Sequence, residues 1–199
     1  MIDWDERYRQ KPALWSGEPG PLLVREVSGM PPGRALELGC GEGADAIWLA
    51  AAGWQVDALD ISTVALGRGR ARAEELGLGS RIRFQQADLG HWRAEPVYDL
   101  VSAQFLHSTD VDRSVILAEA ARAVAPGGTL LIVSHQAMPP WQQFAHHESF
   151  PSALELAEGI GVGEADWRVE VAESVDRTVT GPEGQTATVT DSVLRAARR

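Results

Sequence analysis

Short apolar runs alternate with longer segments of helical periodicity through the middle of the chain. Apolar positions spaced roughly three to four residues apart are typical of a helix, and brief apolar or alternating runs are typical of strands. The strands expected on this basis cover residues 34–38, 55–59, 81–86, 98–103 and 129–134, and the helices cover residues 45–52, 62–76 and 110–124. This alternation predicts right-handed crossovers and a single doubly wound, Rossmann-like α/β fold, with a mostly parallel sheet and helices on both faces.

The N-terminal segment departs from this alternation. Residues 3–9 and 22–27 predict two short helices, and glycines and prolines interrupt regular structure around Trp15 between them. The pair Pro31-Pro32 ends the second helix. Residues 1–31 therefore form a separate N-terminal segment before the regular alternation begins.

The C-terminal third departs from it as well. Proline and aromatic residues predict a lid loop, and two long β segments predict a terminal antiparallel β-hairpin at the edge of the sheet. The expected segments are the loop at 138–150, a helix at 153–158, and strands at 167–179 and 186–194 joined by a turn at 181–184. We therefore expect one domain over residues 1–199, with a core at 32–136 and the lid and hairpin at 137–199.

The composition adds an acidic balance to this picture. The formal net charge is −10, and nothing resembles a basic stripe, so we expect neither nucleic acid nor a membrane surface as the main partner. The single cysteine, Cys40, excludes an internal disulfide and a Cys-only zinc site, and we expect no metal. Without a secretory signal or a membrane-spanning run, the prediction is a cytoplasmic protein, either a monomer or a homodimer.

The most informative stretch is the glycine-rich loop at residues 37–43, Glu-Leu-Gly-Cys-Gly-Glu-Gly, between the first strand and a helix. Glycine allows a tight turn and lets a ligand approach the backbone. The helix behind the loop offers unpaired N–H groups and the positive end of its dipole. Because a plain strand-to-helix turn has the same pattern, the interpretation depends on what surrounds the loop.

Two aspartates follow neighbouring strands. Asp60 closes the second strand and Asp88 closes the third. Side chains at the carboxyl ends of parallel strands face the crevice where nucleotides bind, so Asp60 can accept hydrogen bonds from ribose hydroxyls. Asp88 can accept from an adenine amino group. Either aspartate alone could instead be a helix cap or a turn residue.

A nicotinamide or flavin site is the competing interpretation. Gly39, Gly41 and Ala44 can be aligned with the G-x-G-x-x-G/A fingerprint. Glu37, two residues before the glycines, would repel a pyrophosphate but suits a cationic ligand. The terminal hairpin, and the short length left for a separate substrate domain, also point away from a dehydrogenase.

The ordered set of motifs resembles class I S-adenosylmethionine-dependent methyltransferases. The N-terminal run Trp4 to Tyr8, together with Trp15, resembles the small tellurite-resistance and thiopurine S-methyltransferase group within them. The resemblance implies that residues 1–31 are a cap segment that folds over the cofactor and substrate. The stretches that carry the superfamily resemblance are the glycine loop 37–43, Asp60-Ile61-Ser62, Ala87-Asp88-Leu89, residues 98–101 with 104–107, and Pro126-Gly127-Gly128.

The resemblance implies S-adenosyl-L-methionine as cofactor and S-adenosyl-L-homocysteine as product. It implies that Gly39 and Gly41 admit the methionine and ribose, that Glu37 holds the loop or an ammonium-bound water, and that Asp60 binds the ribose. It also implies contacts along the rest of the cofactor: Trp15 would cover the methionine portion, and Ser62 belongs to the ribose motif. Ile61 and Leu89 would surround the adenine, and Asp88 would accept from its amino group. Gln104 and Phe105 would lie near the transferred methyl group, and Cys40 would pack within the loop.

Methyl transfer by in-line displacement requires chiefly alignment and exclusion of water, and a base only where the acceptor carries a proton. His107 and His135 follow the fourth and fifth strands and are the candidate bases; His146 and His147 lie in the lid loop. Three aromatic residues of the same segment could form an apolar wall for the acceptor: Trp141, Phe144 and Phe150.

The acceptor is expected to be a small molecule. The chain is acidic and lacks the Asn/Asp-Pro-Pro-aromatic pattern associated with methylation of exocyclic amino groups on nucleic acid or of glutamine. Sulfur, nitrogen, oxygen, carbon and metalloid acceptors all stay open. A catalytically inactive S-adenosylmethionine-binding regulator of the same fold is the second hypothesis, and a nicotinamide-dependent oxidoreductase is the third.

Overall fold

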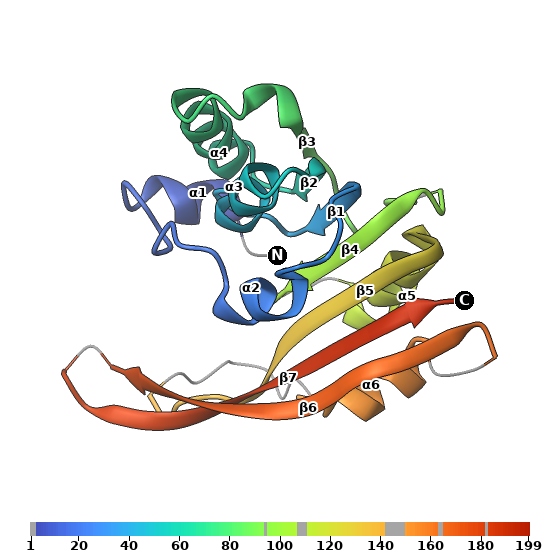
Figure 1. The fold of residues 1–199 in the computed structure, drawn as a ribbon. Helices are drawn as coiled ribbons and strands as arrows, with labels where there is room; N and C mark the ends of the chain where they lie inside the picture. The colour runs from blue at the N-terminus through green and yellow to red at the C-terminus, as the bar shows by residue number, and fades with distance from the viewer. Residues whose placement is uncertain (1–2, 94, 107–110, 142–149, 163–164, 182) are drawn as a thin grey trace.

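A computed structural model of the protein describes residues 3–93, 95–106, 111–141, 150–162, 165–181 and 183–199. The strands are β1 (Arg34–Leu38), β2 (Gln55–Asp60), β3 (Ile82–Gln86), β4 (Tyr98–Gln104), β5 (Val124–Ala137), β6 (Trp167–Thr180) and β7 (Thr186–Arg198). They form one seven-stranded sheet in the order β3-β2-β1-β4-β5-β7-β6 (Figure 1). Pairs among β1 to β5 are parallel, and β7 runs antiparallel to both β5 and β6. The predicted parallel sheet with a terminal antiparallel hairpin is confirmed.

Helices cover both faces of the sheet, as predicted. The helices are α1 (Trp4–Arg9), α2 (Pro21–Val27), α3 (Ala44–Ala51), α4 (Thr63–Glu75), α5 (Arg113–Ala123) and α6 (Ala153–Gly159), with a 3₁₀ turn at Gly79–Arg81. On one face, called here the α3 face, residues of α2, α3 and α4 pack with Leu131, Val133 and Val193 of the sheet. On the other, the α5 face, residues of α5 and α6 pack with Leu130 and Ile132. Among the described residues no helix has the length and apolar character to cross a membrane.

The boundary between α5 and β5 differs from the prediction. The helix expected over 110–124 begins at Arg113, after an Asp112 cap, and ends at Ala123. β5 then begins at Val124, before Pro126-Gly127-Gly128 rather than after it, because Val124 already pairs with Tyr98 of β4. The proline and glycines therefore form an irregularity within the strand, where the register shifts, instead of a turn that precedes it.

The N-terminal helix α1 is tied to the start of α4. Asp5 of α1 accepts hydrogen bonds from the hydroxyls of Ser62 and Thr63, at 2.6 and 2.8 Å, and from the backbone N–H of Val64 at 3.1 Å. These hydrogen bonds lower the pKa of Asp5, chiefly through Ser62. A carboxylate at a helix N-terminus also interacts favourably with the helix dipole. This anchor brings the N-terminal segment to the carboxyl edge of β2.

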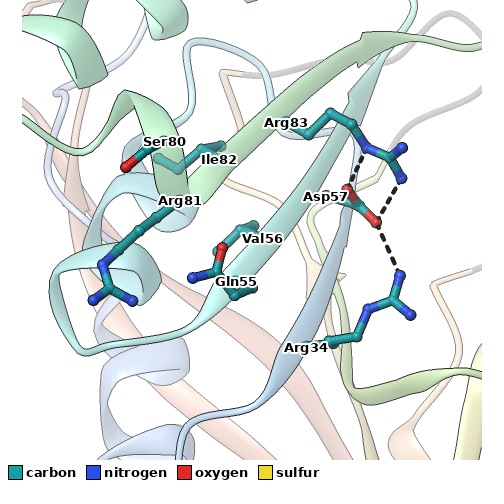
Figure 2. A pocket seen from close by; sticks show the side chains of 8 residues that line it. All are labelled: Arg34, Gln55, Val56, Asp57, Ser80, Arg81, Ile82 and Arg83. Carbon is teal, nitrogen blue, oxygen red and sulfur yellow. Dashed lines mark hydrogen bonds and ion pairs between the residues drawn. The ribbon is translucent and has the colours of Figure 1, made fainter.

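The opposite, amino edge of the sheet carries a polar pocket (Figure 2). Asp57 of β2 lies within it and forms a two-bond ion pair with Arg83, at 2.7 and 3.0 Å. It also accepts from Tyr98 Oη at 2.8 Å and lies 3.8 Å from the guanidinium of Arg34. Burial opposes ionisation of Asp57, but the hydrogen bonds from Arg83 and Tyr98 outweigh it and its pKa is lowered. The network therefore ties β1, β2, β3 and β4 together away from the candidate site.

Asp57→Ala is expected to lower the free energy of unfolding by about 1–3 kcal/mol at neutral pH, because it removes a buried partner of several donors. Since the pKa of Asp57 is lowered on folding, the wild-type advantage is present above the unfolded pKa and disappears as the pH falls through the folded one. Urea unfolding at several pH values measures both effects. Glu75→Ala, which breaks an exposed pair with Arg72, is the control and should cost about 0–1 kcal/mol. Equal losses of unfolding free energy in Asp57→Ala and Glu75→Ala would contradict the stabilising role of the Asp57 network.

Candidate functional site

The loop between β1 and α3 is held against the end of β2. The N–H groups of Gly39 and Cys40 both donate to the carbonyl of Leu59, at 2.8 and 2.9 Å. Gly39 and Gly41 have φ angles of 70° and 52°, in the left-handed region that other residues rarely adopt. The path of the loop therefore requires glycine at these positions, whatever ligand it meets.

Protein side chains lie against both glycines. A Cβ placed on Gly41 would lie 2.8 Å from Tyr8 Oη, and one placed on Gly39 would lie 2.5 Å from Leu106 Cδ1. We predicted bare backbone at these glycines for a ligand to approach; the structure shows that the missing Cβ atoms also make room for these two side chains. The contacts bring the N-terminal segment and the residues after β4 to the loop.

Asp60 joins the glycine loop to the end of β2. Its Oδ2 accepts from the N–H of Gly41 at 2.8 Å, and its Oδ1 accepts from the N–H of Ser62 at 2.9 Å. The carboxyl group is buried, and that burial raises its pKa despite these bonds. Because a carboxylate offers about four acceptor sites, it retains the capacity to accept further hydrogen bonds from hydroxyl groups.

Asp45 and Asp60 both lie near Glu37 and form an acidic cluster with it. Glu37, on the α3 face of β1, is only 3% exposed, and its Oε2 has no hydrogen-bond partner among the described residues. Burial, followed by the charges of Asp45 and Asp60, raises the pKa of Glu37 well above its ordinary value. Asp45 accepts from the N–H of Gly20 at 2.6 Å. In the described part of the chain no ion pair neutralises these three acids, and a buried unpaired carboxyl favours a cationic ligand.

A second unpartnered acceptor lies on the neighbouring strand. Gln104, at the end of β4, donates from Nε2 to Ser102 Oγ at 2.9 Å, whereas its buried Oε1 has no partner in the described part of the chain. β4 pairs with β1 so that Ser102 lies opposite Glu37. A Cβ placed on Gly20 would lie 3.6 Å from Asp45 and 3.9 Å from this Oε1. Glu37 and Gln104 thus bring unsatisfied oxygen atoms to adjacent strand ends, as the ammonium group of an amino acid requires.

Asp88 lies on the same rim of the sheet as Asp60. The backbone N–H of Ala87 donates to the carbonyl of Asp60 at 2.9 Å. β3 ends at Gln86, so Asp88 follows the strand in a turn instead of closing it, which corrects the prediction. Its carboxylate accepts from the N–H of Gly90 at 2.9 Å and from His91 Nδ1 at 2.7 Å, and the histidine contributes most to the lowering of its pKa.

Three other predicted cofactor residues surround this rim. Ile61 is 46% exposed, and its carbonyl accepts from Gln86 Nε2 at 3.1 Å. Leu89 is partly buried against the α5-face cluster. Ser62 caps α4, since its hydroxyl accepts from the N–H of Ala65 at 3.1 Å and donates to Asp5. Ser62 therefore has a structural role that the resemblance did not indicate.

A hydrogen-bonded clamp holds the N-terminal segment on the glycine loop. Glu42 accepts from the N–H groups of Leu14 and Trp15, at 3.1 and 3.2 Å, and from Arg68 of α4 at 2.8 Å. Arg68 also donates to the carbonyl of Tyr8 at 2.8 Å. Trp15 Nε1 donates to Tyr8 Oη at 3.0 Å while the tryptophan stays 53% exposed. The roles of Glu42 and Arg68 were not predicted, because they depend on contacts between segments far apart in the sequence.

Cys40 is buried within the loop. Its burial raises the pKa of the thiol well above the ordinary value. A thiol that stays protonated is a poor nucleophile, which agrees with the predicted packing role.

A polar group lies at the ends of β5 and β7. His135 Nδ1 lies 3.0 Å from Asp191 Oδ1, and Arg177 Nε donates to the other oxygen of Asp191 at 2.6 Å. The ring of Phe105, directly after β4, lies 4.5 Å from the His135 ring and has a φ of 48°. Asp191 was missed, although a charged residue in an otherwise Thr- and Val-rich strand is the signal that could have found it.

The remaining predicted acceptor-side residues are placed only in part. His107, His146, His147 and Phe144 lie outside the described residues. Trp141 contacts the tip of the β6–β7 hairpin, where a Cβ on Gly181 would lie 2.8 Å from the indole, and Phe150 is partly buried. No group of three or more potential metal ligands occurs in the part of the chain that is described.

Comparison with known proteins agrees with this arrangement. The sequence model of a family described as a methyltransferase domain matches residues 35–128. Ribosomal RNA small subunit methyltransferase C of Alcanivorax borkumensis is 32% identical over 59% of this chain and 38% of its own length. 2-Heptyl-1-hydroxyquinolin-4(1H)-one methyltransferase of Mycobacteroides abscessus is 29% identical over 76% of this chain and 69% of its own length. The chain thus spans well under two thirds of the first of these relatives.

Solved structures share the whole fold. A protein studied for the conversion of a disulfide bond into a thioacetal group during echinomycin biosynthesis superposes with a TM-score of 0.72 at 27% identity, over 98% of this chain and 90% of its own. TehB from Haemophilus influenzae superposes with a TM-score of 0.70 at 18% identity, over 99% of this chain and 66% of its own. The chain therefore carries a match to a methyltransferase domain over residues 35–128, and its whole fold is that of the class I methyltransferases that its motifs resemble.

Proposed function

We propose that the protein binds S-adenosyl-L-methionine at the carboxyl edge of β1, β2 and β4 and transfers its methyl group to a small molecule. The observation that carries the proposal is the acidic cluster of Glu37, Asp45 and Asp60. Beside it lie oxygens of Glu37 and Gln104 that have no hydrogen-bond partner among the described residues. S-adenosylmethionine carries an ammonium and a sulfonium, so its charge complements this edge. A pyrophosphate, by contrast, would meet buried carboxyl groups of its own sign.

The described residues suggest how the cofactor would be held. Glu37 and Gln104 would accept hydrogen bonds from its ammonium group, and Asp60 would accept from the ribose hydroxyls while it keeps Gly41 in place. Ile61 and Asp88, on the rim beyond β2 and β3, would contact the adenine. Trp15 in the clamped N-terminal segment would cover the methionine portion.

The reaction needs little chemistry from the protein. The bound cofactor supplies an activated methyl group, and the chain aligns an acceptor atom in line with it and excludes water. The acceptor side is assigned to the edge that holds Phe105 and His135, with His107 as a further candidate base. S-adenosyl-L-homocysteine is the second product.

A small-molecule acceptor is the form of this proposal that the chain favours. Its net charge of −10 opposes binding to a phosphate backbone. The relative that acts on a hydroxyquinolone is covered over 69% of its length, whereas the relative that acts on ribosomal RNA is covered over only 38%. Incubation with radiolabelled S-adenosylmethionine and separate panels of small acceptors and RNA tests this. Labelled small products support it, and labelled RNA alone would refute it.

Calorimetry compares the cofactor candidates. We expect saturable heat with S-adenosylhomocysteine and none with NADH, because only the former brings an ammonium to Glu37 and Gln104. Saturable binding of NADH alone would refute the proposal. Binding of S-adenosylmethionine without turnover of any acceptor would instead favour an inactive cofactor-binding protein.

Asp60→Ala is expected to weaken S-adenosylhomocysteine binding by about 1–3 kcal/mol, since it removes a charged acceptor of the ribose. Asp60→Asn, which keeps one acceptor oxygen for the Gly41 N–H, separates this effect from damage to the loop. Circular dichroism confirms folding, and Glu75→Gln on the exposed surface of α4 is the matched control. Wild-type affinity for S-adenosylhomocysteine in both Asp60 variants would show that Asp60 does not bind the ribose.

Binding is expected to release protons. Burial and its acidic neighbours raise the pKa of Glu37 in the free protein, and a cation beside it favours the ionised form. Affinity for S-adenosylhomocysteine should therefore increase as the pH rises toward this raised pKa, and it should be lower at more acidic pH. Calorimetry in buffers of different ionisation enthalpy counts the protons. Glu37→Gln should abolish the release; unchanged proton release in this variant would assign it to another group.

A further inference from the structure

A row of three polar side chains and one aromatic ring continues the α3 face beyond its apolar part: His135, Asp191, Arg177 and Phe105. Leu131 and Val133 of β5 are buried on this face, and the two-residue period of a strand puts His135 on the same side. On β7, Val193 is buried on this face, so Asp191, two residues away, lies on the same side, and the register pairs Asp191 with His135. Phe105 and Arg177 border this pair from β4 and β6.

This row adjoins the glycine loop. Phe105 lies 4.5 Å from His135, and the next residue, Leu106, lies against Gly39. Glu37 and Gln104 open onto the same face, because they alternate with residues of the α5-face cluster along β1 and β4. The row therefore begins where the proposed cofactor site ends, at the carboxyl edge where α/β sheets bind their ligands.

Asp191 is built to orient His135. It is 1% exposed, and its two oxygens are divided between His135 and Arg177. Burial alone would favour its neutral form, but the hydrogen bonds from His135 and Arg177 outweigh this and lower its pKa. An ionised Asp191 accepts the Nδ1–H of His135, which fixes the tautomer whose basic lone pair is on Nε2.

We propose that His135, oriented by Asp191 and Arg177, removes the proton of an aromatic hydroxyl acceptor that stacks on Phe105. This inference rests on the proposed methyl transfer. The acceptor O–H bond breaks and its proton passes to His135 Nε2, while the oxygen forms a bond to the methyl carbon. The carbon–sulfur bond breaks with its electron pair retained by sulfur, which yields the methyl ether, S-adenosylhomocysteine and an imidazolium. The ionised Asp191 stabilises that imidazolium until solvent takes the proton.

The chemistry of the row selects this acceptor class. Phenolic hydroxyls have a pKa of about 10 and are protonated at neutral pH, so their methylation benefits from a base. Anions such as thiocyanate or carboxylates bring their own lone pair and need none. Phe105 provides an aromatic surface next to the base, and its strained φ of 48° is of the kind found at functional sites.

The test uses the full-length protein with phenol, 1-naphthol and 8-hydroxyquinoline as probes, beside thiocyanate and thiophenol. We expect methylation of hydroxyl probes by the wild type. His135→Gln should lower kcat for them by about 10²–10⁴-fold while S-adenosylhomocysteine affinity changes less than about twofold. With 4-nitrophenol, assayed above its own pKa, His135→Gln should lower kcat far less, because the acceptor oxygen is already ionised.

Asp191→Asn tests the positioning role. It should lower kcat for phenol more than it raises KM, and it should change the pH profile of kcat. Besides Asp191, the charged groups that the described part of the chain brings near His135 include Arg177 on β6 and Arg113 of α5, which donates to Ser134 on the opposite face at 2.9 Å. Asp176→Asn is the control, since Asp176 contacts Thr190 on the same hairpin but is exposed. It should leave both quantities unchanged.

The outcomes separate the two proposals. Methylation of thiocyanate or thiophenol without methylation of any hydroxyl probe would overturn this inference and leave the proposed function standing. Equal losses on phenol and ionised 4-nitrophenol in His135→Gln, with an unchanged pH profile in Asp191→Asn, would show a structural role and also overturn it. Absence of S-adenosylhomocysteine binding by the wild type would overturn both.

Discussion

Two buried carboxyl groups, Glu37 and Asp60, and the half-buried Asp45 form a cluster that has no ion-pair partner among the described residues, and this cluster sets the main constraint on the protein. The charges of Asp45 and Asp60 raise the cost of ionising Glu37. Backbone N–H groups of Gly20, Gly41 and Ser62 donate to Asp45 and Asp60. Among the described residues, Oε2 of Glu37 has no such donor. A cationic ligand would supply both a donor and a compensating charge at Glu37, which is why this cluster matches the proposed cofactor.

The rest of the structure is arranged around this cluster. The crossovers bring the carboxyl ends of β1, β2 and β4 to one edge, and the N-terminal segment is clamped over it by Glu42 and Arg68 (Figure 1). The β6–β7 hairpin extends the same face and brings Asp191 to His135. The Asp57 network braces the amino edge, so the strands are fixed at one end and carry polar groups at the other.

Much of the fold could be predicted, because strand and helix periodicities depend on local sequence. The glycine loop, the strand-end position of Asp60 and the terminal hairpin were found in this way. The start of β5 at Val124 could not be, since pairing with β4 overrides the local Pro-Gly-Gly signal. The Asp191–His135 pair and the contacts of Tyr8 and Leu106 with the glycines also escaped prediction, because they join residues far apart in the sequence.

A crystal structure of the protein with S-adenosylhomocysteine tests the central claim most directly. The account predicts the ligand ammonium within hydrogen-bond distance of the Glu37 carboxyl and Gln104 Oε1, with both ribose hydroxyls on Asp60. Ligand density at the amino edge, in the pocket beside Asp57 and Arg83 (Figure 2), or a ligand phosphate or carboxylate seated against Glu37, would contradict it.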